Sequence, residues 1–256
     1  MKQTKHILLT AVMLLSSLSL SAHDFVKNGI YYNIPEELDF ADPVVSVTFM
    51  GRYYNDYKNE YRGHVTIPST VTYLGRTYRV TSIGAYAFYE CDALTSVSIP
   101  NSVTSIGAWA FDRCGLTTLS LPKSVVEIGN GAFAQCGSLK SVTIPENVKF
   151  IGGFAFAYCT GELIVNCDIP NASWLFSQGD CGVFEKSEFT KVTIGESVTS
   201  IGTQAFADCC NLTSITIPKS VTSIGNSAFS GCSSLTAITI PEGVTNIGYA
   251  TFSGCI

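Results

Sequence analysis

The sequence predicts a β-rich solenoid closed by an N-terminal β cap, with one short strand plus a turn or short helix in each coil of about 23 residues. Three regularities predict this fold class. An Ile-Gly pair recurs along the chain, a phenylalanine follows each pair at a fixed offset, and a cysteine follows each phenylalanine three residues later. A unit this short cannot bury its apolar side chains alone, so the copies must stack on one another.

Residues 1–22 are predicted to be a signal peptide. Lys2 and Lys5 form a charged head, residues 7–20 are mostly apolar, and small residues follow. The apolar run is short and broken by serines, which makes a membrane anchor the weaker alternative. We therefore expect an exported protein, secreted or held at the cell surface, with no membrane span after removal of the signal.

Residues 23–80 are expected to form the β-rich cap. The Asn28-Gly29 pair between apolar stretches predicts a hairpin, residues 44–49 alternate like a strand, and residues 71–80 predict a second hairpin. A cap would cover the core and the strand edge of the first coil. A separate small domain is the alternative, although so short a segment is marginal for independent folding.

A single unit shows how each coil is built. Leu94, Val97 and Ile99 follow the spacing L-x-x-L-x-L, and the last two share one face of a short strand. Gly107 is expected to permit a tight corner. Phe111 then fills the interior, where it stacks on the equivalent residue of the next coil.

The array is assigned to residues 81–256. One interval between successive Ile-Gly pairs is about twice as long as the others, and it hides a degenerate unit. In this irregular coil, at 160–189, Phe184 takes the place of the phenylalanine and Ser187 that of the cysteine. Eight coils result.

The irregular coil carries two large aromatic residues, Trp174 and Phe176. Loops inserted into solenoids often carry binding, so both are candidate ligand-binding residues. Burial within the degenerate coil is the favoured interpretation, because large aromatic side chains are more often buried than displayed.

The seven recurring cysteines are predicted to be buried thiols. Identical side chains in register point the same way, so their sulfurs do not face each other for disulfide formation. A one-dimensional column also does not converge on a metal ion. Cys167 and Cys181 lie outside the column, and they are the pair to examine for a disulfide.

The recurring unit resembles the BspA-like leucine-rich repeats, whose pattern is LxxVxIPxxVTxIGxxAFxxCxxL. The resemblance covers about residues 65–256, with departures at Leu121, Gly195 and Thr251. It implies a leucine-rich-repeat solenoid and a secreted or surface-displayed binding protein. Some members of the family are described as adhesins for host matrix proteins.

The residues argue against catalysis. No histidine lies within the array, so a Ser-His or Cys-His couple would have to reach back to the cap. No Cys-x-x-Cys motif or phosphate-cradling glycine loop is present, and the carboxylates do not fall in one repeated column. The net charge is −5 without a basic stripe, which argues against nucleic acid. We expect no enzymatic activity, no cofactor and no metal.

Two surfaces are candidate binding sites. One is the column of aromatic residues before the Ala-Phe pairs, where Gly131 and Gln204 show that packing does not require an aromatic side chain. Covering the edge of the core is its favoured role, and anchoring a ligand is the alternative. The other surface is the outward side of the strands, which either solubilises the sheet or binds a ligand. The aromatic candidates are Tyr86, Trp109 and Phe154, and the strand candidates are Ser96, Ser98, Thr118, Ser120, Ser141, Thr143, Lys191, Thr193, Ser214 and Thr216.

These observations predict an exported, non-enzymatic binding protein, an adhesion module that recognises a host extracellular or cell-surface protein or glycan. A structural module is one alternative. It would self-associate through the open C-terminal coil, because the chain stops in mid-repeat and we expect further sequence or a partner there. A carbohydrate-binding accessory protein, with the aromatic column as a sugar platform, is the other alternative.

Overall fold

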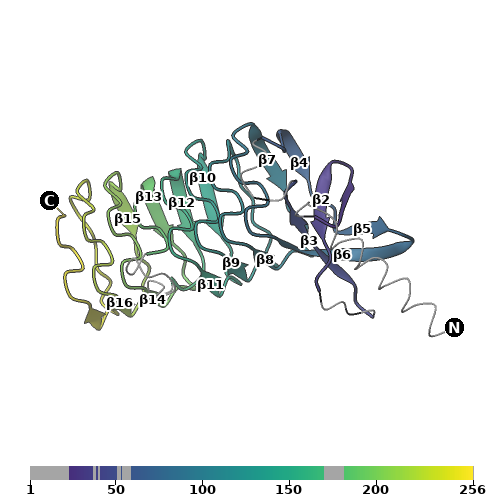
Figure 1. Ribbon diagram of the computed structural model, residues 1–256. Coiled ribbons are helices and arrows are strands. Elements are labelled where there is room, and N and C mark those ends of the chain that lie inside the picture. Colours follow the sequence, from purple (N-terminus) through teal and green to yellow (C-terminus); the bar gives the residue numbers. More distant parts are fainter. Residues whose placement is uncertain are drawn as a thin grey trace.

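The computed structural model describes residues 23–36, 39, 41–50, 53, 59–169 and 182–255. The predicted signal peptide lies outside these residues, as do Trp174, Phe176 and Cys181. Within them the chain forms one stack of coils, which runs from right to left in Figure 1. Short strands and turns build the coils, and the described residues form no helix. The predicted β-rich solenoid is confirmed.

The N-terminal region contains the two hairpins that the sequence predicts. In the first, Asn28 and Gly29 have φ values of 51° and 75°, as the tight turn of such a hairpin requires. In the second, Leu74 and Gly75 make the same kind of turn, with φ values of 48° and 75°. The strands of this region are β1 (Phe25–Lys27), β2 (Ile30–Asn33), β3 (Val44–Thr48), β5 (Thr70–Tyr73) and β6 (Arg76–Ile83).

Two rows of parallel strands run along the stack, and Figure 1 shows them on opposite sides of the coils. The row of longer strands contains β4 (Gly63–Thr66), β7 (Leu94–Ser98), β10 (Ser141–Ile144), β12 (Thr160–Val165), β13 (Glu188–Ile194) and β15 (Ser214–Thr216). The row of two-residue strands contains β8 (Ser105–Ile106), β9 (Glu127–Ile128), β11 (Phe150–Ile151), β14 (Ser200–Ile201), β16 (Ser223–Ile224) and β17 (Asn246–Ile247).

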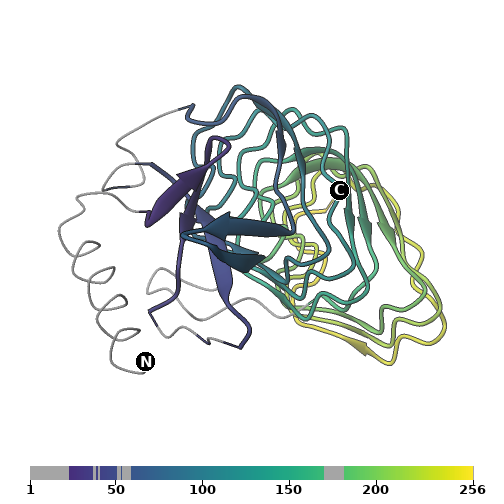
Figure 2. The ribbon, with the colours of Figure 1, turned by 90° about the vertical axis from the view of Figure 1, so that its right-hand side faces the viewer.

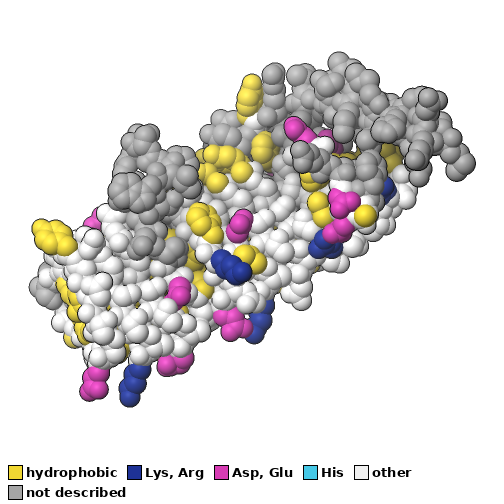
Figure 3. All heavy atoms as spheres, turned by 90° about the horizontal axis from the view of Figure 1, so that it is seen from below, with side chains coloured by type: hydrophobic (Ala, Val, Ile, Leu, Met, Phe, Trp, Pro, Cys, Tyr) yellow, Lys and Arg dark blue, Asp and Glu magenta, His cyan; other side chains and the backbone are white. Residues whose placement is uncertain are grey.

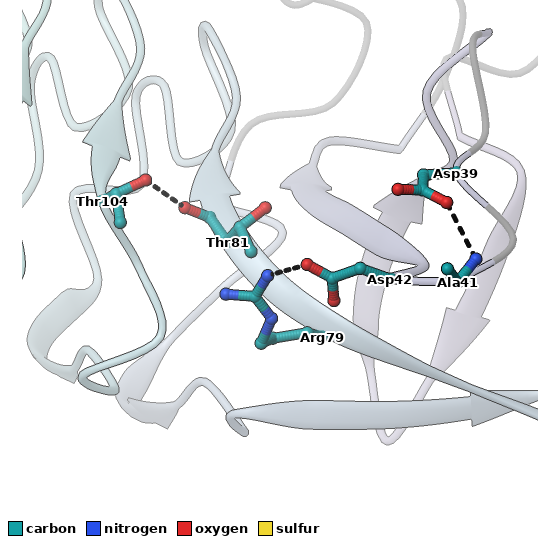
Figure 4. A network of polar contacts seen from close by, with 6 residues as sticks. All are labelled: Asp39, Ala41, Asp42, Arg79, Thr81 and Thr104. Atoms are coloured by element: carbon teal, nitrogen blue, oxygen red, sulfur yellow. Dashed lines mark hydrogen bonds and ion pairs between the residues drawn. The ribbon is translucent and has the colours of Figure 1, made fainter.

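The N-terminal strands join the array through a shared sheet. β3 pairs in parallel with β6, and β6 pairs in parallel with β8. At this junction Arg79 forms an ion pair with Asp42, and the Thr104 hydroxyl donates to the Thr81 carbonyl at 3.3 Å (Figure 4). Seen along the stack in Figure 2, the hairpins lie in front of the first coils. The hairpins and the first coil thus share one sheet, and the division of the chain into a cap and an array stays a prediction.

The first rung of the longer row lies earlier than the assigned start of the array. β4 pairs in parallel with β7, and Val65 lies beside Val97 in this register. The Ile67-Pro68 pair that follows β4 matches the Ile-Pro pairs of later coils. A hairpin separates this rung from the next Ile-Gly pair, which hides the repeat from a search at fixed spacing.

A column of phenylalanine rings forms the centre of the core. Successive rings lie 4.7–5.7 Å apart between centroids, and most of the pairs are nearly parallel. Phe184 occupies its predicted place, 5.6 Å from Phe156 and 5.1 Å from Phe206. The irregular segment is therefore one coil of an unbroken stack of eight. The stacked residues are Phe88, Phe111, Phe133, Phe156, Phe184, Phe206, Phe229 and Phe252.

The glycine that follows each isoleucine at the corner of a coil is needed for a different reason from the one that the sequence suggests. Gly107 does not adopt a positive φ, so backbone freedom is not what the corner needs. A Cβ at this position would instead lie 2.5 Å from the Ala85 backbone nitrogen. Glycine is required because adjacent coils approach too closely for any side chain.

The recurring cysteines are thiols, as predicted, and the structure adds their partners. The Cys136 sulfur donates to the Phe111 carbonyl at 3.1 Å, and Cys159 donates to the Phe133 carbonyl at 2.9 Å. The same bond recurs in the other coils, always to the phenylalanine of the preceding coil. Each of these six cysteines, from Cys114 onward, therefore satisfies a carbonyl between two coils. The members of this column are Cys91, Cys114, Cys136, Cys159, Cys209, Cys232 and Cys255.

Candidate functional site

The outward side of the longer strands presents a largely polar surface, which we call the long-strand face. Parallel pairing aligns its side chains in two columns across β10, β12, β13 and β15, and again across β4 and β7. Between these two sheets the predicted strand at Thr118 and Ser120 is not formed, although both side chains are exposed. All ten predicted strand candidates are exposed or half-buried. The structure therefore brings these candidates together on one face, and their role in binding stays a prediction.

The irregular coil contributes two residues to this face that the sequence analysis missed. β12 places Glu162 between Ser141 and Lys191, and Ile164 between Thr143 and Thr193. Ile164 is 37% exposed, and the Lys191 ammonium lies 3.6 Å from the Glu162 carboxylate. The short run of strand-favouring apolar residues Leu163, Ile164 and Val165 was the signal that could have identified this strand.

His64 reaches the array from β4, which the sequence analysis did not anticipate. Its Nδ1 lies 2.7 Å from the Ser96 hydroxyl, and its Nε2 lies 3.1 Å from the Thr66 hydroxyl and 3.2 Å from that of Ser98. A catalytic triad needs one imidazole nitrogen for the nucleophile and the other for an orienting carboxylate. In this protein both imidazole nitrogens of His64 contact hydroxyl groups, and the residue is exposed. This cluster of polar side chains therefore belongs to the long-strand face.

The aromatic column lies on the turn that follows each Ile-Gly pair. Tyr86, Trp109 and Phe154 have φ values of 58°, 55° and 57°, in the left-handed region. Gln204 and Ser227 share this backbone, so it belongs to the coil and not to the aromatic residues. A left-handed backbone costs a residue with a side chain about 1 kcal/mol or more. Bulky aromatic rings are therefore an unfavourable choice for these positions on backbone grounds.

The Trp109 indole packs on the next coil. Three atoms of its six-membered ring lie 2.2–2.6 Å from the position that a Cβ on Gly131 would occupy. An edge-on ring would bring at most two bonded atoms so close, so the three short distances show that the ring lies face-on over Gly131. Glycine at this position makes room for the indole, and Trp109 remains half-buried.

Beside the aromatic column runs a second column of exposed turn residues. Arg113 bonds Glu90 at 2.7 Å and Gln135 at 3.3 Å, which links three successive coils. Further along, the Lys186 ammonium lies 5.5 Å from the centre of the Phe154 ring. This contact shows that the two columns are adjacent, and we call them together the turn face.

One buried carboxyl lies beneath the turn face. Asp112 is 3% exposed, and the Gln135 amide nitrogen donates to it at 3.4 Å. Burial raises the pKa of Asp112 to about 6 against the lowering effect of Arg113, with a smaller raising contribution from Glu90. Desolvation of the carboxylate thus outweighs its attraction to the arginine.

Hollows on the surface are shallow and polar. One hollow, of about 480 Å³, lies on the side of the two-residue strands and is lined by Lys149, Asp168, Ser200, Ser223 and Asn246. Figure 3 shows this side from below, where neutral polar surface predominates and charges are scattered. In the described part of the chain, no three His, Cys, Asp or Glu side chains gather to hold a metal ion. No helix of that part is long and apolar enough to cross a membrane.

The strand rows, the phenylalanine column and the thiol column define a leucine-rich-repeat solenoid. A family model described as the BspA type leucine rich repeat region matches residues 55–174 and 180–256 in six copies, and the chain belongs to this family. The match begins before residue 81, in agreement with the early rung at β4. No curated protein matches the chain.

Solved structures are similar to the chain. A leucine rich repeat protein from T. pallidum is 22% identical, with a TM-score of 0.52 over 82% of this chain and 90% of that one, which shows the shared fold. A leucine-rich repeat protein from Bacteroides capillosus is 30% identical, with a TM-score of 0.40 over 52% of this chain and 88% of that one. A leucine rich cell surface protein from Faecalibacterium prausnitzii is 20% identical, with a TM-score of 0.30 over 93% and 86%.

Proposed function

We propose that this protein is an exported, non-enzymatic binding module that attaches to a host protein or glycan through the long-strand face. The observation that carries the proposal is the alignment of outward side chains across β10, β12, β13 and β15 in one parallel sheet, with hydroxyls on β10, β13 and β15 and Glu162 and Ile164 on β12. A surface this broad and shallow suits a macromolecule better than a small substrate, which needs a concave pocket. The sequence of residues 1–22 supports export.

The chemistry of the face is consistent with binding without catalysis. Catalysis needs convergent titratable groups of matched geometry. On the long-strand face Glu162 pairs with Lys191, and His64 contacts hydroxyls only. These groups offer hydrogen bonds to a ligand but no nucleophile with an oriented base.

Surface plasmon resonance of the mature chain tests the proposal. Fibronectin, fibrinogen and host cell-surface glycans are immobilised, and binding to at least one is expected. A double variant, Ser141→Arg with Ser214→Arg, places two long charged side chains on the face and should weaken that binding by roughly tenfold or more, equivalent to about 1.4 kcal/mol. The matched control is Asn101→Arg with Asn211→Arg, at exposed positions outside the strands.

The outcomes separate the alternatives. Binding that is lost in the strand variant and kept in the control supports the long-strand face. Equal binding by both variants rejects this face as the site. Failure of the mature chain to bind any member of the panel rejects the adhesion function.

A further inference from the structure

We propose that the turn face is a second binding site, which takes an extended neutral oligosaccharide laid along the solenoid axis with one sugar ring stacked on Trp109. This inference deepens the proposed binding function by naming a ligand class, and it uses a different face of the molecule. Four features of the turn face lead to it.

The first feature is the indole itself. One face of the Trp109 six-membered ring is covered by Gly131, because three of its atoms crowd the Cβ position there. The side chain is half-buried, so its remaining exposure belongs to the other face and the edges. A fixed ring lying flat on a surface offers its π face to the C–H groups of a pyranose. It does not protrude, so it cannot fill a pocket on a protein partner as interface anchors do.

The second feature is the restriction of the aromatic residues to part of the array. Tyr86, Trp109 and Phe154 occupy the left-handed turn position in coils of the N-terminal half. The same position holds Gln204, Ser227 and Ala250 further along, with φ values of 52–54°. The coil therefore forms with small or polar residues there, and the fold does not account for the aromatic rings.

The third feature is the set of polar groups beside the indole. Arg113 is held between Glu90 and Gln135 by bonds of 2.7 and 3.3 Å, and Gln135 is held in turn by Asp112. Side chains fixed in this way lose little freedom when they bind a sugar hydroxyl. Planar guanidinium, amide and carboxylate groups are suited to paired hydrogen bonds with vicinal hydroxyls.

The fourth feature is the balance of charge. Arg113 pairs with Glu90, Lys186 pairs with Glu185 at 3.7 Å, and the carboxyl of Asp112 lies beneath Arg113, so no positive group is left unmatched among them. An anionic glycan gains nothing from such a surface. The coils repeat at 4.7–5.3 Å along this part of the stack, close to the length of one sugar in an extended glycan. Successive coils can thus meet successive sugars.

The test uses the mature chain on an array of neutral hexasaccharides (cellohexaose, maltohexaose, xylohexaose and N-acetylchitohexaose) beside sulfated and sialylated glycans. At least one neutral hexasaccharide should bind, and isothermal titration should show roughly tenfold weaker binding by Trp109→Ala. Ala250 shows that the turn accepts alanine, so this variant is expected to fold. The matched control, Gln204→Ala, changes the same turn position outside the aromatic coils and should keep its affinity.

Three results would overturn the inference. These are no binding of any neutral hexasaccharide, unchanged affinity in Trp109→Ala, and a clear preference for sulfated or sialylated glycans. Loss of thermal stability in Trp109→Ala without loss of affinity would show that the indole only packs the turn. The Ser141→Arg and Ser214→Arg variant should retain the hexasaccharide. Failure here with intact binding to matrix proteins would therefore leave the proposed function standing.

Discussion

Replacing Phe133 with alanine is expected to destabilise the solenoid by about 4 kcal/mol. The side chain is fully buried, and its ring lies 5.2 Å from Phe111 and 5.3 Å from Phe156 between centroids. Truncation of a buried phenylalanine costs about 3–5 kcal/mol. Contacts on both sides of the ring place Phe133 toward the upper part of that range, since each aromatic pair adds about 0.5–1.5 kcal/mol. This is a large share of the roughly 5–15 kcal/mol that stabilises a typical domain.

Urea unfolding followed by far-ultraviolet circular dichroism measures the loss. The control is Phe150→Ala, which removes the same side chain from β11, where it is 39% exposed and outside the column of rings. We expect this control to cost about 1 kcal/mol or less, as surface changes usually do. Comparable losses in the two variants would refute the claim that the ring column supports the stack.

Three further predictions concern the coil contacts and the titratable groups. Gly129→Ala should lower the free energy of unfolding in urea by about 1–3 kcal/mol, because its Cβ would lie 2.6 Å from the Ala108 backbone nitrogen. The control Gly137→Ala, whose Cβ would have no atom nearer than 3.9 Å, should be close to neutral. Equal effects of the two variants would contradict the close approach of adjacent coils. Burial raises the pKa of Asp112 from 3.8 to about 6, so its favourable contribution below about pH 4 is lost as the pH rises through 6. Asp112→Asn should therefore raise stability at pH 8 by on the order of 1–3 kcal/mol and change little below pH 4, and a pH-independent effect in thermal melts would contradict this sign. With a thiol reagent at pH 8, exposed Cys210 should react in the fast phase. Burial raises the pKa of Cys91 to about 11, so this thiol should react slowly until urea is added. A fast phase that is undiminished in Cys210→Ser would argue against this assignment.

Periodicity in the sequence was sufficient to predict the repeating parts of the fold. The places of Phe184 and Ser187 in the irregular coil are confirmed, because the ring column and the thiol column admit only small changes of register. Ser187 makes a different contact from the cysteines, because its hydroxyl lies 3.2 Å from the Cys209 sulfur of the next coil. A strict repeat fixes the interior because each side chain must meet its own copy in the next coil.

Features that depend on contacts between coils could not be predicted in the same way. The partner of each thiol, the Phe carbonyl of the preceding coil, is set by the rise and rotation between coils, which spacing does not reveal. The same holds for the indole of Trp109 over Gly131, whose pairing crosses two units. β4 and β12 were missed because a hairpin and an insertion displaced each from its expected interval.

The structure places the two predicted sites, the strand candidates and the aromatic candidates, in different surroundings. The strand candidates lie on one side of the stack, where Glu162, Ile164 and His64 join them. The aromatic candidates occupy a strained turn and pack on their neighbours. Alternation of side chains along a strand can be read from the sequence, whereas a left-handed turn occupied by Gln, Ser, Ala and Trp has no residue signature.

Hydrogen exchange at β12 tests the central claim most directly, because the sheet that carries the proposed binding face, from β10 to β15, is continuous only if the irregular coil supplies this rung. Leu163 and Ile164 pair with β10 on one side and β13 on the other. The amides of residues 160–165 should therefore exchange as slowly as those of β10 and β13 in the mature chain. Exchange of these amides as fast as that of the exposed turn at Gly137 would contradict a continuous eight-coil array, and with it the proposed binding face.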